Sequence, residues 1–358
     1  MKKALVTILA LVFCLSLMAG CGGTTSGTDS STATGNTGTS GNTDATKEVY
    51  TFTLAHASAE DTTSHLSFVE LEKFLEDSGR FDVNLYPNGQ LGADREAIEG
   101  VQNGDIMMTC TSPAPQANFV PAAMIFDVPF AVMNVDMIRY LENNEDFIDG
   151  LRKYYAEKGF YMGYMCDMTF RIMTSRGVEV HTPADLKGFN IRTMENANHM
   201  LLWSSLGANP TPIAYTELYT ALQQGTVDGQ ENALELAITQ KFYEQQDHAN
   251  ITNHLMHANL APINLDWYNS LDDEARDIFN EGLIMARDYM HSLVDANQEG
   301  YREFCNENGM PINDLTVEEL EAFAALTTPV DEKVDGELKA QNCDIYDTFI
   351  AAVESYPG

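Results

Sequence analysis

The sequence has few basic residues and none of the short motifs that mark common catalytic or nucleotide sites. Lys and Arg number 20 against 53 Asp and Glu in 358 residues, which gives a formal charge of −33. Such a charge repels nucleic acids, so nucleic-acid binding is excluded. There is no GxGxxG, P-loop, GxSxG or HExxH motif. No nucleophile stands with a base and an orienting group, which speaks against an enzyme, and we expect no cofactor.

Metal-binding patterns are also missing. Cysteine occurs six times without any CxxC spacing. His254 and His257 are the one histidine pair at a spacing that metals use, and they lack an obvious third ligand, so we predict no metal site. The four cysteines of the folded part either include one disulfide or are buried free thiols. These cysteines are Cys110, Cys166, Cys305 and Cys343.

A long apolar run is present only at the N-terminus. Residues 1–20 hold two lysines, then an apolar stretch, and end in Met-Ala-Gly before Cys21. This order is typical of a lipoprotein signal peptide, so we expect Cys21 to carry lipid and to hold the protein on the outer face of the cell membrane. The alternative is an ordinary signal peptide with a chance cysteine. No later run approaches about 18 apolar residues, so no transmembrane segment is expected.

The segment after Cys21 is dominated by Gly, Ser, Thr and Asn. Such a composition cannot bury apolar surface, and residues 21–47 are therefore predicted to be a flexible tether. Residues 48–358 are long enough for a domain with two sizeable lobes.

The first part of this domain alternates between strand and helix patterns. The β-α-β-α-β order predicts parallel strands with helical crossovers, in the segments 49–55, 64–77, 81–85, 94–103 and 105–110. Ligands of such sheets lie beyond the carboxyl ends of the strands. His56 and Ser112, which follow two of these strands, are therefore candidates to face one cleft.

The remaining chain predicts a second α/β lobe and several helices. Residues 135–158 are expected to form one long helix, and 160–165 a strand that leads to Arg171. The segment 272–308 has no proline and predicts a helix long enough to cross both lobes. Two more helices are expected, at 316–326 and 331–355.

Five motifs together resemble the solute-binding proteins of TRAP (tripartite ATP-independent periplasmic) transporters, the DctP family. The likeness runs from Val49 to the C-terminus, and motifs of this length in this order are specific. They are 86–92 (YPNGQLG), 126–130 (FDVPF), 182–192 (TPADLKGFNIR), 206–208 (LGA) and 219–232 (YTALQQGTVDGQEN).

The resemblance implies an α/β, two-lobed, type II periplasmic-binding-protein-like fold with a long helix across both lobes. It implies lobe I at about 48–169 and 258–297, and lobe II at about 170–257 and 298–358. It further implies a protein without enzymatic activity that captures a small organic acid outside the cytoplasm. The acid is then delivered to the membrane subunits of a permease driven by an ion gradient.

The resemblance also places the site residues. It puts the carboxylate-binding arginine on Arg192, a second ligand-contacting arginine on Arg171, an amide on Asn232 and an aromatic wall on Tyr215. A guanidinium suits this role because its planar fork matches a carboxylate. Each residue has a structural alternative. These are an interlobe salt bridge for Arg192, an unspecified structural role for Arg171, a helix N-cap for Asn232, and for Tyr215 core packing on a helix face shared with Tyr219.

The ligand is less well defined than the site. Sialic-acid-binding members resemble this chain but have Glu where it has Ser112. Sialic acid is therefore disfavoured. Because the first-loop segment 59–62 resembles the dicarboxylate-type branch, a C4-dicarboxylate-like acid is the preferred ligand, and sugar, keto and aromatic acids are alternatives. Two other functions stay open, an extracellular enzyme and a sensory ligand module for a membrane kinase.

Overall fold

The computed structural model describes residues 47–358. The predicted signal peptide, Cys21 and the tether up to residue 46 lie outside the described residues. The described chain is built on one nine-stranded sheet, in the order β2-β1-β3-β8-β4-β7-β5-β6 with β9 paired to β8. The strands are β1 (Tyr50–Ala55), β2 (Phe81–Tyr86), β3 (Met108–Thr109), β4 (Phe160–Ser175), β5 (Asn190–Thr193), β6 (Asn209–Pro212), β7 (Gly229–Asn232), β8 (His248–Asn264) and β9 (Ile312–Asp314).

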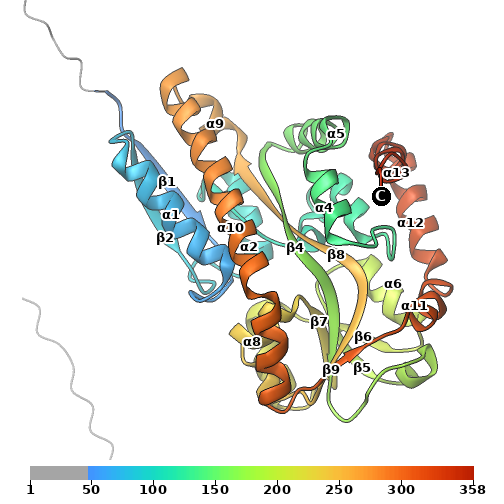
Figure 1. Cartoon of the computed structure of the whole chain (residues 1–358). Coiled ribbons are helices and arrows are strands. Elements are labelled where there is room, and N and C mark those ends of the chain that lie inside the picture. Colours follow the sequence, from blue (N-terminus) through green and yellow to red (C-terminus); the bar gives the residue numbers. More distant parts are fainter. Residues whose placement is uncertain (1–46) are drawn as a thin grey trace, which may run out of the picture. The chain divides into compact units, whose positions relative to one another are not determined.

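The sheet supports two lobes (Figure 1). We refer to the part built on β1, β2 and β3 as lobe I and to the part built on β5, β6, β7 and β9 as lobe II. The α-helices are α1 (Thr63–Asp77), α2 (Asp94–Asn103), α3 (Pro113–Gln116), α4 (Val135–Glu142), α5 (Glu145–Ala156), α6 (Ala197–Ser205), α7 (Leu218–Gln223), α8 (Leu234–Thr239), α9 (Leu265–Ser270), α10 (Asp273–Glu307), α11 (Val317–Ala324), α12 (Thr328–Ala340) and α13 (Ile345–Glu354). Short 3-10 helices are η1 (Pro121–Asp127), η2 (Pro183–Leu186), η3 (Tyr215–Glu217) and η4 (Phe242–Glu244).

Lobe I has the parallel strands that its sequence predicts, since β1 pairs in parallel with both β2 and β3. Strand β3 is shorter than the predicted 105–110. The amides of Asp105 and Ile106 donate instead to the carbonyl oxygen of Gly100, at 2.9 and 3.2 Å. They thereby close the end of α2, and only Met108 and Thr109 are left to pair.

Two long antiparallel strands join the lobes. Strand β4 pairs with β8 from Phe160 and Asn264 in lobe I to Ser175 and His248 in lobe II. The predicted strand 160–165 is therefore only the first part of β4. The register shifts between Asp167 and Phe170, where Thr169 has a φ of 72° and its amide donates to the Asp167 carboxylate at 2.6 Å. This irregular step lies where the chain passes from one lobe to the other.

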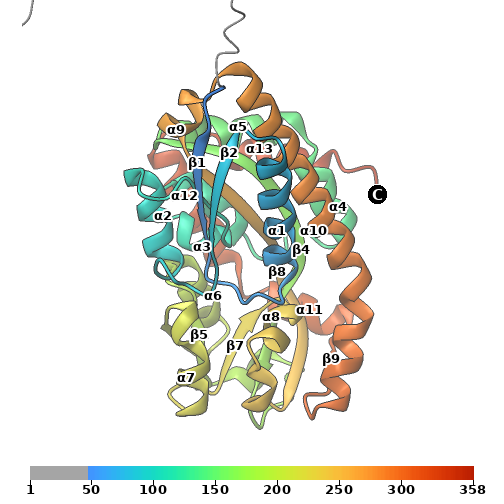
Figure 2. The ribbon, with the colours of Figure 1, turned by 90° about the vertical axis from the view of Figure 1, so that its left-hand side faces the viewer.

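The longest helix is α10, with 35 residues, which matches the predicted 272–308. It runs along both lobes, and Figure 2 shows its first half beside α1, next to β1 and β2. Gly282 of α10 permits this close approach, because a Cβ built there would lie 2.9 Å from a methyl carbon of Leu71.

Two helix predictions are wrong. The expected helix 135–158 is two helices, since Asn144 accepts a hydrogen bond from the amide of Phe147 at 3.0 Å and so begins α5 as an N-cap. The expected helix 331–355 is also two, α12 and α13. Asn342 between them has a φ of 56°, a left-handed conformation that a helix cannot contain.

The four cysteines of the folded part are all buried free thiols, so the structure favours that alternative over a disulfide. Among residues 47–358, no helix combines the length and the apolar character that crossing a bilayer requires.

Candidate functional site

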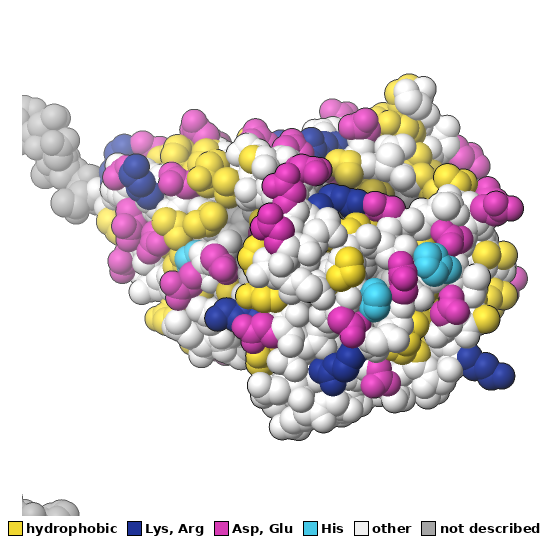
Figure 3. Space-filling model, turned by 60° about the horizontal axis from the view of Figure 1, so that its bottom comes forward, with side chains coloured by type: hydrophobic (Ala, Val, Ile, Leu, Met, Phe, Trp, Pro, Cys, Tyr) yellow, Lys and Arg dark blue, Asp and Glu magenta, His cyan; other side chains and the backbone are white. Residues whose placement is uncertain are grey.

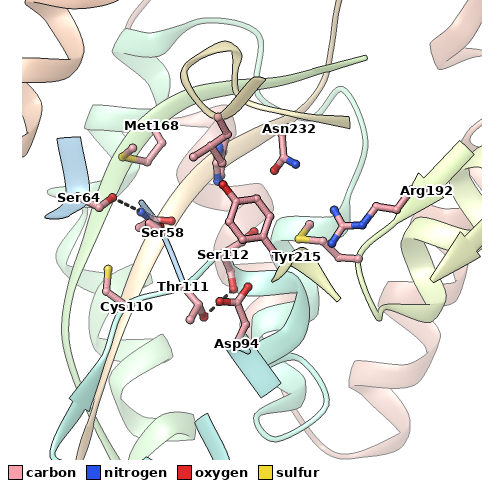
Figure 4. A pocket seen from close by; sticks show the side chains of 14 residues that line it. Ser58, Ser64, Asp94, Cys110, Thr111, Ser112, Met168, Arg192, Tyr215 and Asn232 are labelled. Carbon is pink, nitrogen blue, oxygen red and sulfur yellow. Dashed lines mark hydrogen bonds between the residues drawn. The ribbon is translucent and has the colours of Figure 1, made fainter. Parts of the chain in front are cut away.

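A small cavity lies at the junction of the lobes (Figure 4). Lobe I and the joining strands contribute Ser58, Ser64, Asp94, Cys110, Thr111, Ser112, Met168, His257 and Asn259. Lobe II contributes Arg192, Met194, Tyr215, Asn232 and Leu236. The cavity has a volume of about 40 Å³. Its walls therefore stand close together.

Arg192 supplies positive charge to this cavity. It lies on β5 and is 1% exposed. Its Nε donates to the carbonyl oxygen of Ile213 at 2.8 Å, while its Nη1 is buried without a partner. Burial lowers the pKa of Arg192 to about 10, against the opposing effect of Glu231, so the group is charged at neutral pH. No salt bridge to Arg192 forms in the described part of the chain, and the interlobe ion pair is not observed.

Asn232 is held at the cavity by its neighbours. It ends β7, and its Oδ1 accepts from Nη2 of Arg171 at 2.9 Å while its Nδ2 donates to Oε1 of Gln230 at 2.8 Å. The N-cap alternative is wrong, because the N-cap residue of α8 is Ala233 and no side chain caps the helix. One face of the amide is thus fixed, and its orientation toward the cavity is set before a ligand arrives.

Arg171 does not line the cavity. Its guanidinium forms a buried ion pair with Glu231, in which Nη2 donates to Oε1 at 3.0 Å and to the Glu231 carbonyl oxygen at 2.7 Å. Here the structural alternative is observed, as a salt bridge between β4 and β7. Nη1 of Arg171 is buried without a partner and is the remaining donor that could serve a ligand.

Behind this pair lies a buried charge network. Burial alone would raise the pKa of Glu231, but Arg171 and two histidines hold it well below its usual range. One of them, His199, has Nε2 3.1 Å from Asp127 and Nδ1 3.6 Å from Glu231. Burial opposes the charging of His199, yet these two carboxylates raise its pKa to about 9. His254 completes the set, with Nε2 3.2 Å from Glu231.

Asp127 and Glu231 of this network are matched by Arg171 and protonated His199. Among residues 47–358, no carboxylate lies within ion-pair distance of Arg192, although Asp94 of the same cavity interacts with it electrostatically. Figure 3 shows Asp and Glu side chains spread over the face that it presents. The positive site is therefore local and buried, whereas the acidic side chains of this face lie on the surface.

Tyr215 and Ser112 both line the cavity, whereas His56 does not. Tyr215 lies in η3, and its buried hydroxyl has no partner. Tyr219 is in the next helix, α7, and donates to Glu244 at 2.6 Å, so the two tyrosines lie in separate helices. His56 is buried and bonded to His65 at 3.2 Å, and burial lowers the pKa of its ring to about 3.

Asp94 was missed in the sequence and is the main addition to the site. It is the first residue of α2, directly after the loop of the YPNGQLG motif. Burial raises the pKa of its carboxyl to about 6, an effect that Arg192 partly offsets. A carboxyl at the first turn of a helix usually stabilises the helix, so the sequence pattern did not distinguish a ligand-facing role from a structural one.

Within the part of the chain that the structure describes, no three His, Cys, Asp or Glu residues group as metal ligands. His254 and His257 lie on β8, where His257 lines the cavity and His254 bonds Glu231. The arrangement offers a cation, an amide and hydroxyls, which suits binding of an anion.

Comparison with known proteins gives the family context. A sequence profile described as "Bacterial extracellular solute-binding protein, family 7" matches residues 54–336. A solute-binding protein of Verminephrobacter eiseniae is 33% identical over 262 residues, covering 72% of this chain and 76% of that protein. The C4-dicarboxylate-binding periplasmic protein DctP of Rhodobacter capsulatus is 28% identical over 295 residues, covering 80% and 87%. A TRAP periplasmic solute-binding protein of a Polaromonas species, solved with D-erythronate, has a TM-score of 0.79 at 27% identity, covering 86% and 99%.

Proposed function

Because the chain belongs to family 7 of the bacterial extracellular solute-binding proteins, we propose that its cavity captures a small organic acid by the carboxylate and that Arg192 is the group that holds it. The captured acid is then delivered to the membrane subunits of a TRAP permease. The observation that carries this proposal is Nη1 of Arg192, a buried and charged donor without a partner.

The energetics are adequate for a capture protein. Micromolar binding needs about −8 kcal/mol. One charge-assisted hydrogen bond contributes roughly 1.5–3 kcal/mol, so Arg192 and Asn232 together supply a substantial part. The remainder comes from desolvation of the ligand as the lobes close, less the cost of ordering them.

Asp94 constrains the other end of the ligand. A second carboxylate placed beside it would meet a like charge, whereas a hydroxyl could donate to it. We therefore favour a small hydroxy acid with one carboxylate over the C4 dicarboxylate that the sequence suggests. The D-erythronate in the Polaromonas structure is an acid of this type. A C4 dicarboxylate stays as the second candidate and requires a protonated Asp94.

Calorimetry with D-erythronate, succinate, pyruvate and benzoate at pH 8 tests the proposal. We expect the hydroxy acid to bind more tightly than succinate, and the Arg192→Gln variant to bind none of them. Retained affinity in that variant would show that another group takes the carboxylate. Tighter binding of succinate than of D-erythronate at pH 8 would contradict the role given to Asp94.

Lipidation of Cys21 is also part of the proposal. A protein that must hand its ligand to a membrane permease gains from a tether, because the tether raises its local concentration at the membrane. The sequence around Cys21 supports this assignment, and the residue lies outside the described part of the structure.

A further inference from the structure

Glu235, which the sequence did not single out, makes a buried contact across the lobes. It lies in the first turn of α8 in lobe II and is 4% exposed. Its Oε1 accepts from the backbone amide of Thr63 at 2.6 Å, and its Oε2 accepts from the Thr63 hydroxyl at 3.1 Å. Thr63 begins α1 in lobe I. The hydroxyl of Tyr301, on α10, also donates to Oε1 at 3.3 Å.

The two elements joined by this contact belong to separate hydrophobic cores. Helix α1 packs its buried face, including Phe68 and Leu71, into the core of β1, β2 and α10. Helix α8 packs Leu234 and Ala237 into the core of lobe II. The bond between Glu235 and Thr63 therefore links two helices whose apolar faces pack in different cores, with α10 contributing to both.

The contact also lies next to the cavity. Ser64, the neighbour of Thr63, and Leu236, the neighbour of Glu235, both line it. Holding the starts of α1 and α8 together therefore holds these two walls together. Glu235 itself is not among the lining residues, so its carboxylate is separate from the ligand contacts.

We propose that Glu235 is a positioning residue that fastens the closed state: it bonds the first turn of α1 across the cleft and so slows ligand release without touching the ligand. This inference rests on the proposed function. A buried carboxylate that accepts two hydrogen bonds at the start of a helix satisfies an amide that the helix itself cannot pair. Separation of the lobes breaks both bonds at once, so they stabilise only the closed arrangement.

Two substitutions at Glu235 distinguish the loss of its hydrogen bonds from a change in side-chain packing. Glu235→Gln keeps the shape and can still accept from the Thr63 amide and donate to its hydroxyl, so it should behave nearly as wild type. Glu235→Leu keeps the volume and removes the acceptors. Glu217→Gln is the matched control, because Glu217 is exposed on η3 in the same lobe.

Hydrogen exchange of the ligand-free protein gives a readout that needs no ligand. In Glu235→Leu we expect amides 63–66 to exchange at least ten-fold faster than in wild type, while amides in the middle of α10 are unchanged. X-ray scattering should show a larger radius of gyration for this variant. Glu235→Gln and Glu217→Gln should match wild type in both measurements. Unchanged exchange at 63–66 in Glu235→Leu would overturn the proposal.

Release kinetics provide the second arm, with D-erythronate and succinate as probes. For any probe that wild type binds, Glu235→Leu should dissociate at least five-fold faster, with the association rate changed less than two-fold. Equal dissociation rates would refute the proposed fastening. If neither probe binds wild type, the ligand class proposed above fails, and the exchange experiment still decides the role of Glu235.

Discussion

Arg171 and Glu231 lie on the neighbouring strands β4 and β7 and form a buried, two-pronged ion pair, with Nη2 of Arg171 3.0 Å from Oε1 of Glu231. Arg192 lies on β5, on the other side of β7, and has no such partner among residues 47–358. The two arginines that the sequence offered as a pair are therefore unequal. Arg171 holds β7 and Asn232 in place, whereas Arg192 makes no ion pair and keeps a buried Nη1 without a partner.

Replacing Arg192 tests whether this residue binds the ligand. Arg192→Gln should weaken binding of the best acid of the panel by about 100-fold or more, because a charge-assisted contact is lost inside a closed site. The melting temperature of the ligand-free protein should stay the same or rise, since an unpaired buried cation costs free energy. Calorimetry and a thermal melt measure the two effects. A large fall in the melting temperature would indicate a structural role instead.

Replacing Arg171 tests whether its ion pair with Glu231 stabilises the fold. Arg171→Gln alone should lower the free energy of unfolding by about 3 kcal/mol, because the Glu231 carboxylate stays buried with less compensation. The double variant Arg171→Gln, Glu231→Gln should recover part of that loss. Urea unfolding measures both. If the single and double variants are equally unstable, the two residues are not energetically coupled.

Asp94 should make both stability and binding depend on pH. Its pKa is raised from about 3.8 to about 6 in the folded state, so the stability that its neutral form provides is present below pH 3.8 and lost as the pH rises through about 6. Asp94→Asn keeps an uncharged group at every pH. Its melting temperature should exceed that of wild type at pH 8 and equal it near pH 4.

For the same reason, wild type should bind a carboxylate more tightly as the pH falls through about 6, and the Asp94→Asn variant should lose this dependence. The benefit should be larger for succinate than for D-erythronate. If the affinities of wild type and Asp94→Asn change with pH in the same way between pH 5 and 8, Asp94 does not face the ligand.

The raised pKa of His199 predicts a second loss of stability, at higher pH than the one from Asp94. Its pKa is raised from 6.5 to about 9, so its contribution to stability is complete below pH 6.5 and is lost as the pH rises through about 9. The difference in unfolding free energy between wild type and His199→Gln should therefore shrink over that interval. Denaturant titrations at pH 6, 8 and 9.5 measure it. A constant difference would mean that the ring is neutral in the folded protein.

Cys21→Ser tests the lipid anchor. We expect wild type to fractionate with membranes and the variant to appear in the extracytoplasmic soluble fraction, because a single residue carries the proposed lipid. Lys47→Ser, a change in the folded part close to the tether, is the control and should stay with the membranes. Membrane association of Cys21→Ser would contradict the anchor.

The local sequence pattern predicted helices and strands correctly where apolar spacing follows the backbone geometry. The alternation in lobe I predicted parallel strands, and the run from 272 to 308 predicted α10. It failed where a single asparagine ends or begins a helix, as Asn144 and Asn342 do, because apolar spacing continues across both. His56 was placed correctly after a strand, but its partner His65 could not be foreseen.

The sequence by itself determined the family, the α/β architecture and the identity of Arg192 and Asn232 as candidates, because long motifs and periodic apolar spacing are local properties of the chain. Only the tertiary structure decided which buried charges are cancelled. Pairing depends on distances between β4, β5 and β7, and residues 60 positions apart in the chain lie within hydrogen-bonding reach there. For the same reason, the place of Asp94 at the cavity and the contact of Glu235 with α1 became visible only once the chain was folded.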